Sequence, residues 1–422
     1  DDGRDLPDGR YVARVSVRYP NGDLAEGRTN VILMDRVYPS ARLKISHSIF
    51  SPNGDGRNDS VRIEQESLPG DIWQGRILDA KGTAMRTWSW AGAAESFDWD
   101  GKGQDGLSLP DGVYQYELVS EDQAGNRFAS ARHSIEIDAA RKAVRLEAEQ
   151  RALSPNRDGQ KDELGLRASV QSQERVKGYE LRIVGQEGPQ ALQAVRSWKG
   201  NGAVPERFVW KGEMDSGAQA QDGRYAAALR VEYTNGDVEE SASGSFLMDR
   251  VFPKIEVSAS LGIISPNGDG RSDVVEIAQR SVPGDDWRGK IVGPDGRVVR
   301  SYSWKGEAKG FAWDGTDEGG NVVRDGEYRY VVESTDGAEN RTEHSGIRVM
   351  VETEKKVVRM DADAMAFSPN GDGVKDVLKI LVRAQNHGAV KDFALSIFRE
   401  GNTIPVRTWK GSSDLRSEYL WD

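Results

Sequence analysis

The sequence lacks cysteine altogether, contains four histidines, and has no run of about 20 apolar residues. Without cysteine there are no disulfides, thiolate metal sites or cysteine nucleophiles, and the redox compartment stays open. A membrane-spanning helix needs about 20 apolar residues, so we expect no direct membrane span. The histidines share no repeat position and have no evident catalytic partners: His47, His133, His344 and His387.

Clustered positive charge is also missing. Asp and Glu number 68 against 57 Lys and Arg, for a formal net charge of -11. Proteins that bind nucleic acids without sequence preference neutralise phosphates with grouped Lys and Arg, so we expect no nucleic-acid partner. Acidic residues that are adjacent in the sequence, such as Asp285 and Asp286, would point to opposite faces of a strand. They are therefore not expected to form the pair of catalytic carboxylates that a glycosidase uses. We therefore expect no enzyme, and divalent cations are the more natural partners of this charge.

Helical periodicity is essentially missing as well. Short runs that alternate between apolar and polar residues, such as 114–119, are separated by Gly, Pro, Asn and Asp at roughly ten-residue spacing. This pattern is typical of β-sandwiches. We predict an all-β chain of tandem Ig/fibronectin-III-like β-sandwiches, arranged as an elongated rod because the linkers are short and contain no Gly/Ser tracts.

One nine-residue loop of the type Ser-Pro-Asn-Gly-Asp-Gly-x-x-Asp occurs four times, at 51–59, 154–162, 265–273 and 368–376. The interval from Ser51 to Ser265 equals the interval from Ser154 to Ser368, and we call it the long period. Within the long period a shorter spacing, 51 to 154, is followed by a longer one, 154 to 265, so two related units alternate. We call them even and odd units, and in both a Trp-bearing segment and an Asp-Gly-x-Tyr turn follow the loop.

The repeats predict five segments. Their boundaries follow the strand that closes each unit: 1–39, the second half of an odd unit; 40–140, an even unit; 141–253, an odd unit; 254–354, an even unit; and 355–422, the first half of an odd unit. We expect the chain to be a fragment of a longer array. A second possibility is that half-units of neighbouring chains complete one another by strand donation.

The motifs together resemble a known family. Ser-Pro-Asn-Gly-Asp-Gly, Trp-Asp-Gly at 99–101, Leu-Pro-Asp-Gly-Val-Tyr at 109–114 and Asp-Gln-Ala-Gly-Asn at 122–126 are similar to the Ig-like domain of the bacterial flagellar hook-capping protein. They also resemble gliding-motility-associated C-terminal domains. The resemblance implies an Ig-like sandwich in an extracytoplasmic bacterial protein, where such domains are scaffolds, spacers or sorting modules. Tandem alternation, and Arg157 in place of the first loop Gly, depart from the pattern.

The loops present oxygen donors at alternate positions before a Gly, as compact calcium loops do. The candidate ligands are Ser51, Asn53, Asp55, the Arg57 carbonyl, Asp59, Asn156, Asp158, Asp162, Ser265, Asn267, Asp269, Asp273, Asn370, Asp372 and Asp376. Loop position 12 is Arg62, Gly165, Glu276 and Lys379, so the bidentate carboxylate of an EF-hand is present at most once. Any calcium binding should therefore be weak, in the millimolar range.

The same residues also favour a plain turn, because Asn and Asp side chains bond nearby backbone and Gly supplies positive φ. Both interpretations stay open, with the turn slightly favoured; the last Asp of each loop discriminates, since a turn has less need of it. The repeated Trp residues favour core packing over sugar stacking. Exposure of Trp73 and Trp287 would favour stacking.

We conclude from the sequence that the chain is a structural segment of a repetitive extracytoplasmic bacterial protein: a rod, stalk or filament at the cell surface, secreted or periplasmic. The partners expected are neighbouring copies of the repeats, including a homopolymer, or other envelope proteins. The alternatives are an adhesin or carbohydrate-binding stalk that uses Trp-bearing loops, and a non-catalytic spacer of a large secreted enzyme.

Overall fold

The computed structural model describes residues 5–385 and 390–422. Residues 1–4 of the first predicted segment and 386–389 of the last, including His387, lie outside this range. The described residues form strands and two short 3-10 helices, η1 (Gln173–Arg175) and η2 (Gly188–Gln190), with no α-helix among them. Within those ranges no helix has the length and apolar character to cross a membrane. Residue contacts divide the chain into two compact units, Asp1–Arg250 and Val251–Asp422.

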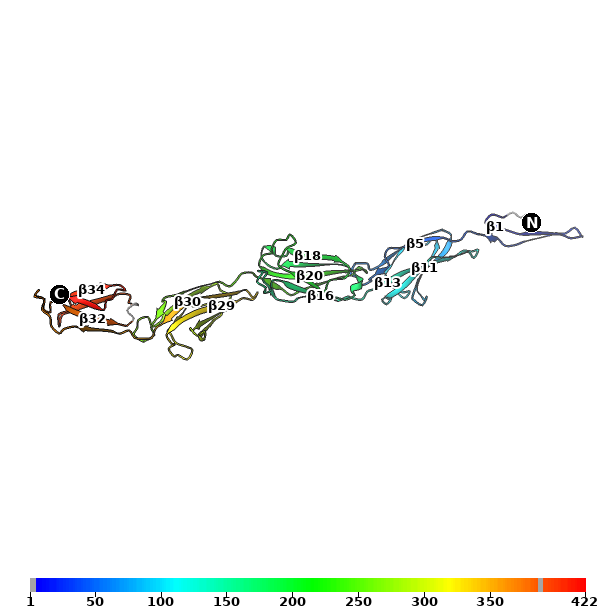
Figure 1. Cartoon of the computed structure of the whole chain (residues 1–422). Helices are drawn as coiled ribbons and strands as arrows, with labels where there is room; N and C mark the ends of the chain where they lie inside the picture. The colour runs from blue at the N-terminus through cyan, green and yellow to red at the C-terminus, as the bar shows by residue number, and fades with distance from the viewer. Residues whose placement is uncertain (1–4, 386–389) are drawn as a thin grey trace. The chain divides into compact units, whose positions relative to one another are not determined.

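The first unit contains a sandwich over residues 41–137, which we call the first even sandwich (Figure 1). Its smaller sheet has the order β10-β7-β5, and its larger sheet has the order β6-β13-β11-β8-β9, with β12 paired to β11. The strands are β5 (Ala41–Ile45), β6 (Ile49–Phe50), β7 (Val61–Ser67), β8 (Asp71–Leu78), β9 (Ala84–Gly92), β10 (Phe97–Trp99), β11 (Gly112–Glu121), β12 (Arg127–Ala129) and β13 (His133–Ile137).

The odd sandwich follows over residues 144–248, with the sheet orders β14-β16-β19 and β15-β22-β20-β17-β18, and β21 paired to β20. Strand β15 pairs in parallel with β22, as β6 does with β13, whereas the neighbouring pairs are antiparallel. The strands are β14 (Val144–Ala148), β15 (Ala152–Leu153), β16 (Leu164–Val170), β17 (Val176–Gly185), β18 (Ala194–Asn201), β19 (Arg207–Trp210), β20 (Gly223–Tyr233), β21 (Val238–Ala242) and β22 (Phe246–Met248).

The second unit contains the second even sandwich, over residues 255–351, with the sheet orders β23-β25-β28 and β24-β30-β29-β26-β27. This arrangement repeats that of the first even sandwich. The strands are β23 (Ile255–Ala259), β24 (Ile263–Ile264), β25 (Val275–Ser281), β26 (Trp287–Val292), β27 (Val298–Trp304), β28 (Phe311–Trp313), β29 (Gly326–Thr335) and β30 (Arg341–Val351).

The segments at the two ends are smaller. The N-terminal one has two antiparallel pairs, β1-β4 and β2-β3, and the C-terminal one has the sheets β31-β32-β35 and β33-β34. The strands are β1 (Gly9–Tyr11), β2 (Arg14–Arg18), β3 (Leu24–Arg28), β4 (Ile32–Met34), β31 (Val358–Ala362), β32 (Leu378–Ala384), β33 (Phe393–Phe398), β34 (Pro405–Gly411) and β35 (Glu418–Trp421).

Alternation of side chains builds each core. In β11, Tyr114, Tyr116 and Leu118 are buried and face the opposite sheet, as the two-residue period of a strand requires. Burial raises the pKa of the Tyr116 hydroxyl, which donates to Gln65 Oε1 at 2.7 Å and so leaves its polar end satisfied. The prediction of tandem Ig/fibronectin-III-like sandwiches in an all-β chain is confirmed.

The loop Pro and the Gly of the Trp-x-Gly turn recur together because they touch. A Cβ on Gly101 would lie 3.0 Å from Pro52 Cγ, and one on Gly315 would lie 2.8 Å from Pro266 Cγ. The φ values of these glycines, +75° and +72°, also suit Gly better than residues with a side chain. Packing of the Pro ring thus fixes the loop against the core edge of its own sandwich.

Candidate functional site

The four repeated loops share one conformation, which is held by hydrogen bonds from backbone N–H groups to side-chain oxygens. In the first loop the two carboxylate oxygens of Asp59 accept the backbone N–H groups of Gly54 and Gly56. The last Asp of each other loop, Asp162, Asp273 and Asp376, does the same, and the eight bonds measure 2.6–3.0 Å. The turn conformation therefore uses the last Asp of each loop, contrary to the expectation that a plain turn has less need of it.

The remaining loop donors bond locally as well. Asn53 Oδ1 accepts the N–H of Asp55, and Asp55 Oδ1 accepts the N–H of Arg57, at 2.9 and 2.8 Å. The equivalent Asn and Asp side chains repeat these bonds: Asn156 and Asp158, Asn267 and Asp269, Asn370 and Asp372. The fourth, sixth and eighth loop positions all have positive φ, between 46° and 87°.

The serines of the loop differ in their surroundings. Ser51 is fully buried and its hydroxyl has no hydrogen-bond partner, whereas Ser265 Oγ accepts Asn267 Nδ2 at 3.1 Å. Among residues 5–385 and 390–422, no group of three or more His, Asp or Glu side chains is arranged to hold a metal ion. In this conformation the last Asp faces N–H donors, so calcium would have to compete with them, and calcium binding stays a prediction.

Protonation of the last Asp should weaken the loop. Hydrogen bonds from Gly371 and Gly373 N–H lower the pKa of Asp376 below its usual 3.8. A carboxylate with a lowered pKa stabilises the fold above pH 3.8 and loses that contribution as the pH falls further.

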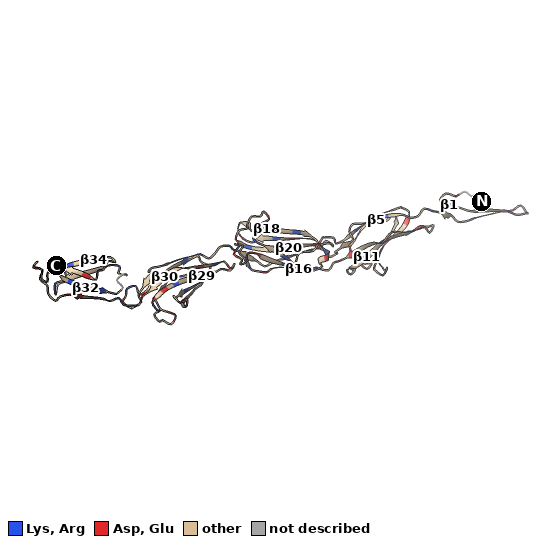
Figure 2. Cartoon of the chain, viewed as in Figure 1, with Lys and Arg blue, Asp and Glu red and all other residues tan. Residues whose placement is uncertain are grey.

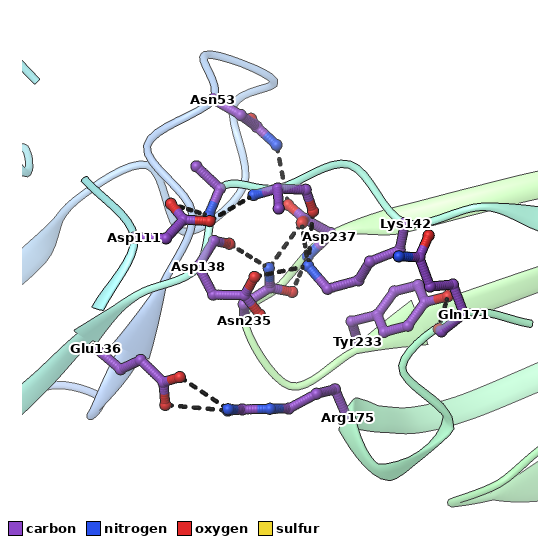
Figure 3. Close-up of polar contacts among 12 residues, drawn as sticks. Asn53, Asp111, Glu136, Asp138, Lys142, Gln171, Arg175, Tyr233, Asn235 and Asp237 are labelled. Carbon is purple, nitrogen blue, oxygen red and sulfur yellow. Dashed lines mark hydrogen bonds and ion pairs between the residues drawn. The ribbon is translucent and has the colours of Figure 1, made fainter. Parts of the chain in front are cut away.

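A second site lies between the first even sandwich and the odd sandwich, and we call it the joint (Figure 3). It comprises the loop residue Asn53, the linker residues Asp138 and Lys142, and Asn235 and Asp237 from the turn between β20 and β21. Asn235 is fully buried, and Lys142 and Asp237 are 4% and 6% exposed. Buried charges of this kind are costly unless they are paired.

The ammonium group of Lys142 has all three of its hydrogens satisfied. Nζ donates to Asp138 Oδ1 and to the carbonyl oxygen of Ala140, both at 3.0 Å, and to Asp237 Oδ2 at 3.3 Å. It also lies 5.4 Å from the centre of the Tyr233 ring. Burial raises the pKa of Tyr233 to about 12, and its hydroxyl donates to the carbonyl oxygen of Gln171.

Asp237 connects the joint to the repeated loop. Its Oδ1 accepts Asn53 Nδ2 at 2.9 Å, and its Oδ2 accepts Asn235 Nδ2 at 2.7 Å in addition to Lys142. Asn235 Nδ2 donates to the Asp138 carbonyl oxygen as well, at 2.7 Å. The carboxylate thus contacts the loop of one sandwich and the linker into the next.

Glycine at position 236 allows the turn between β20 and β21 to lie close against the loop at 51–59. The Gly236 N–H donates to the Tyr233 carbonyl oxygen, and φ of Gly236 is +95°, as in a three-residue hairpin with Gly in the left-handed region. A Cβ on Gly236 would lie 2.6 Å from Asn58 Nδ2 of the neighbouring loop. Glycine is therefore required both by the turn and by the contact.

One further contact joins the two sandwiches directly, and another restrains the linker between them. Arg175 forms a bidentate pair with Glu136 at 2.8 and 3.0 Å, and this pairing raises the pKa of the Arg175 guanidinium. The carboxylate of Asp111, from the Asp-Gly-x-Tyr turn, accepts the N–H groups of Ala139 and Ala140, each at 3.0 Å. The linker is held from both sandwiches (Figure 3).

We did not predict the joint, although the sequence carries a signal for it. Tyr233-Thr234-Asn235-Gly236-Asp237 has its equivalent one long period earlier, in Tyr19-Pro20-Asn21-Gly22-Asp23. Asp138 and Lys142 have their equivalents one long period later, in Glu352 and Lys356, which pair at 3.4 Å. Residues that recur at the long period without a core position indicate contacts between units.

The two Trp residues that were considered for a sugar-binding surface are not accessible to a sugar. Trp73 and Trp287 are fully buried, and Trp73 Nε1 donates to the Leu68 carbonyl oxygen at 3.2 Å. They cannot stack on a sugar in this fold, so that form of the alternative is wrong.

Lys and Arg are interspersed with Asp and Glu on the sandwiches, and many pair across strands (Figure 2).

Comparisons with solved structures give distant likenesses. A tetra-tandem repeat from the extending region of a large adhesion protein is 15% identical with a TM-score of 0.33, covering 83% of each chain. A Ca²⁺-stabilized adhesin with which an Antarctic bacterium binds ice is 13% identical, with a TM-score of 0.30 and 81% of each chain covered. Fibronectin(III)-like modules of CbhA from Clostridium thermocellum are 11% identical with a TM-score of 0.28, covering 50% of this chain and 96% of theirs.

No curated protein matches the sequence. A family model does match within the second even sandwich, over residues 290–338, and its family is the FlgD Ig-like domain. These residues include the Trp-Asp-Gly turn at 313–315 and the Asp-Gly-x-Tyr turn at 325–328. The resemblance drawn from the motifs is thereby confirmed, and residues 290–338 are a match to the FlgD Ig-like domain.

Proposed function

We propose that the chain is a structural segment of a repetitive extracytoplasmic bacterial protein, a rod or stalk in which polar joints restrain successive Ig-like sandwiches. The observation that carries this proposal is Lys142, buried between Asp138 of the linker and Asp237 of the odd sandwich. Domains joined by a linker move freely unless their interface restrains them. A buried, fully hydrogen-bonded ion group provides such restraint, and a flexible tether has no need of one.

The chemistry of the described surface supports a spacer over a catalyst. The polar clusters with the most hydrogen bonds serve turns and the joint: the loop carboxylates bond backbone N–H groups, and Asp237 bonds Asn53, Asn235 and Lys142. Their oxygen atoms are engaged in holding backbone and neighbouring domains in place. We place the segment in an extracytoplasmic protein that is at the cell surface, secreted or periplasmic. Its partners are other copies of the repeats or envelope proteins. Its modules are the five segments predicted from the sequence.

Small-angle scattering of the whole chain tests the proposal. A globular chain of 422 residues has a radius of gyration of about 22 Å. We expect a value well above that, with the scattering of a stiff, extended particle at low protein concentration. A radius near the globular value would contradict the proposed rod.

We further propose that the four loops bind calcium weakly, with the fifteen predicted residues as its ligand set. The alternation of oxygen donors supports this, since calcium takes six to eight oxygens, and carboxylate oxygens have spare lone pairs besides those that accept N–H groups. Calcium would supply a further link between loop carboxylates. Competition with the N–H donors of Gly54 and Gly56 for Asp59 makes the predicted affinity millimolar.

A further inference from the structure

The smaller sheet of each full sandwich ends at an edge strand, which is β5, β14 or β23. In the odd sandwich this edge is covered, because Ser241 Oγ of β21 accepts the backbone N–H of Leu146 at 3.1 Å. Leu146 is accordingly buried, with 3% of its surface exposed. The equivalent residues of the two even sandwiches, Leu43 and Val257, face the core but are only half-buried. The even sandwiches therefore have an open edge where the odd sandwich has a closed one.

The free backbone groups of these two edges point away from their own sheets. Two backbone bonds fix the alternation in each strand: Leu68 N–H to the Ser40 carbonyl and Ser46 N–H to the Arg62 carbonyl in β5, and Val282 N–H to the Lys254 carbonyl and Ser260 N–H to the Glu276 carbonyl in β23. Even-numbered residues thus bond the neighbouring strand. In an antiparallel ladder the residues between them, Leu43 and Val257 included, present their N–H and C=O groups to the other side.

A groove recurs at the beginning of both edge strands. In the second even sandwich its volume is about 560 Å³, and Ile255, Arg280 and Thr342 are among the residues that line it. In the first even sandwich the equivalent residues, 40–42 and 66–68, line a groove of about 340 Å³. Both even sandwiches are therefore open beside the strand that β21 covers in the odd sandwich.

We propose that β5 of one copy of this chain pairs antiparallel with β23 of a second copy, so that two three-stranded sheets join into one six-stranded sheet. Unpaired strand edges invite such pairing. In the register that we propose, Leu43 and Val257 lie directly opposite each other and exchange both of their backbone hydrogen bonds. The core-facing residues of the two strands then meet as three apolar pairs: Ala41 with Ala259, Leu43 with Val257, and Ile45 with Ile255.

Charge on the exposed face of the two strands favours this partner. In the proposed register Lys44 lies opposite Glu256, in a non-hydrogen-bonded pair, where cross-strand side chains are closest. Each of these residues already lies opposite a residue of the other charge in its own sheet, Lys44 opposite Glu64 and Glu256 opposite Arg280. Charges would therefore alternate along one row across the joined sheet, and opposite charges directly across a ladder stabilise it.

Pairing of either edge with a copy of itself is less favourable. Two β5 strands aligned on Leu43 would place Arg42 opposite Lys44, and like charges directly opposite each other destabilise a ladder. Two β23 strands aligned on Val257 would place Glu256 opposite Ser258, which offers no positive charge. The basic edge and the acidic edge therefore select each other.

The contact is heterologous, because two different surfaces meet. This inference goes beyond the spacer role and does not rest on it, since β5 and β23 each belong to a single sandwich. Loss of the restraint at Lys142 would leave both edges intact, and failure of the strand pairing would leave the joint intact.

Crosslinking tests the register, and the absence of native cysteine makes it specific. One preparation carries Arg42→Cys and another Ser258→Cys, at two exposed positions that the register places opposite each other. After mixing and oxidation we expect the mixed disulfide in high yield. Glu66→Cys in place of Arg42→Cys is the matched control, because Glu66 is also exposed but lies one strand further from the edge, and its yield should be several-fold lower. Equal yields from both mixtures, or no mixed disulfide, would overturn the proposal.

Sedimentation velocity tests the charge pair. We expect the unmodified chain to form oligomers that grow with concentration. Lys44→Glu and Glu256→Lys should each weaken association about fivefold, and the two changes in one chain should restore much of it. Their effects within each sheet, such as loss of the pair between Lys44 and Glu64, persist in the double variant, so restoration reports the contact between copies. A monomer at every concentration, or a double variant that associates as weakly as the single ones, would overturn the proposal.

Hydrogen exchange tests the backbone pairing. The N–H groups of Leu43 and Val257 should become protected as the protein concentration rises. The N–H of Leu146 is the control and should keep the same protection throughout, because its partner Ser241 belongs to the same chain. Exchange at Leu43 and Val257 that does not change with concentration would overturn the proposal.

Discussion

The side-chain amide of Asn53 donates a 2.9 Å hydrogen bond to the carboxylate of Asp237, which belongs to the next sandwich. Through this bond a loop that recurs in every unit becomes part of the contact between two units. Asp237 also bonds Lys142 and Asn235, so three other side chains depend on one carboxylate. The joint is a polar network rather than an apolar interface.

Asp237→Ala should open the joint. The change leaves the Lys142 ammonium buried with only Asp138 and the Ala140 carbonyl as partners, at a cost of about 2–3 kcal/mol. Hydrogen exchange of the backbone at 138–143 and 233–238 should become about 30- to 140-fold faster, as each 1.4 kcal/mol is a factor of ten. Asp23→Ala is the matched control, because Asp23 occupies the same turn on an exposed hairpin. Unchanged exchange in Asp237→Ala would show that the carboxylate does not hold the joint.

Gly236→Ala should disturb the joint by more than the backbone strain of its left-handed φ accounts for. Both Gly236 and Gly22 have left-handed φ, +95° and +96°, so Ala at either position costs about 1–2 kcal/mol in its hairpin. A Cβ at 236 also meets Asn58, whereas a Cβ at 22 has nothing within 4 Å. Exchange measured at the loop, residues 53–59, should therefore rise in Gly236→Ala and stay unchanged in Gly22→Ala. An equally small rise in exchange in both variants would show that the close contact between position 236 and Asn58 plays no part in the joint.

Much of the fold was predictable because it depends on local patterns. The alternation in 114–119 predicts a strand with Tyr114, Tyr116 and Leu118 inward, and the structure buries all three. The joint was not predictable in the same way, because Lys142 and Asp237 are ordinary charged residues until two sandwiches bring them together. The role of Asp59 also stayed open, since a carboxylate that accepts two N–H groups has the same sequence pattern as one that binds calcium.

Calcium should raise the melting temperature of the chain, with half of the effect at millimolar concentration, the range expected of weak extracellular sites. Asp273→Asn should reduce this rise, because it removes a charged ligand from one loop. Asp295→Asn, in the turn between β26 and β27, is the control and should not reduce it. A melting temperature that is indifferent to calcium and to chelator would leave the four loops as turns.

Acid should destabilise the odd sandwich through Glu180. Hydrogen bonds from Arg182 and Lys199 lower the pKa of Glu180 from its usual 4.5 to about 2. The ionised form is favoured in the folded state, so its contribution is complete above pH 4.5 and is lost as the pH falls towards 2. Glu180→Gln should flatten the pH dependence of thermal unfolding over this window. Parallel curves for the two proteins would show that Glu180 contributes nothing there.

The restraint of the joint is the central claim, and a distance distribution between the two sandwiches tests it most directly. Spin labels on Leu107→Cys and Leu192→Cys occupy surface positions that are 68% and 90% exposed, in a chain with no other cysteine, diluted with unlabelled chain. We predict a narrow distribution that Lys142→Met broadens and Lys356→Met, the equivalent change outside the first unit, leaves narrow. A broad distribution in the unchanged protein, or one that Lys142→Met does not alter, would contradict the account.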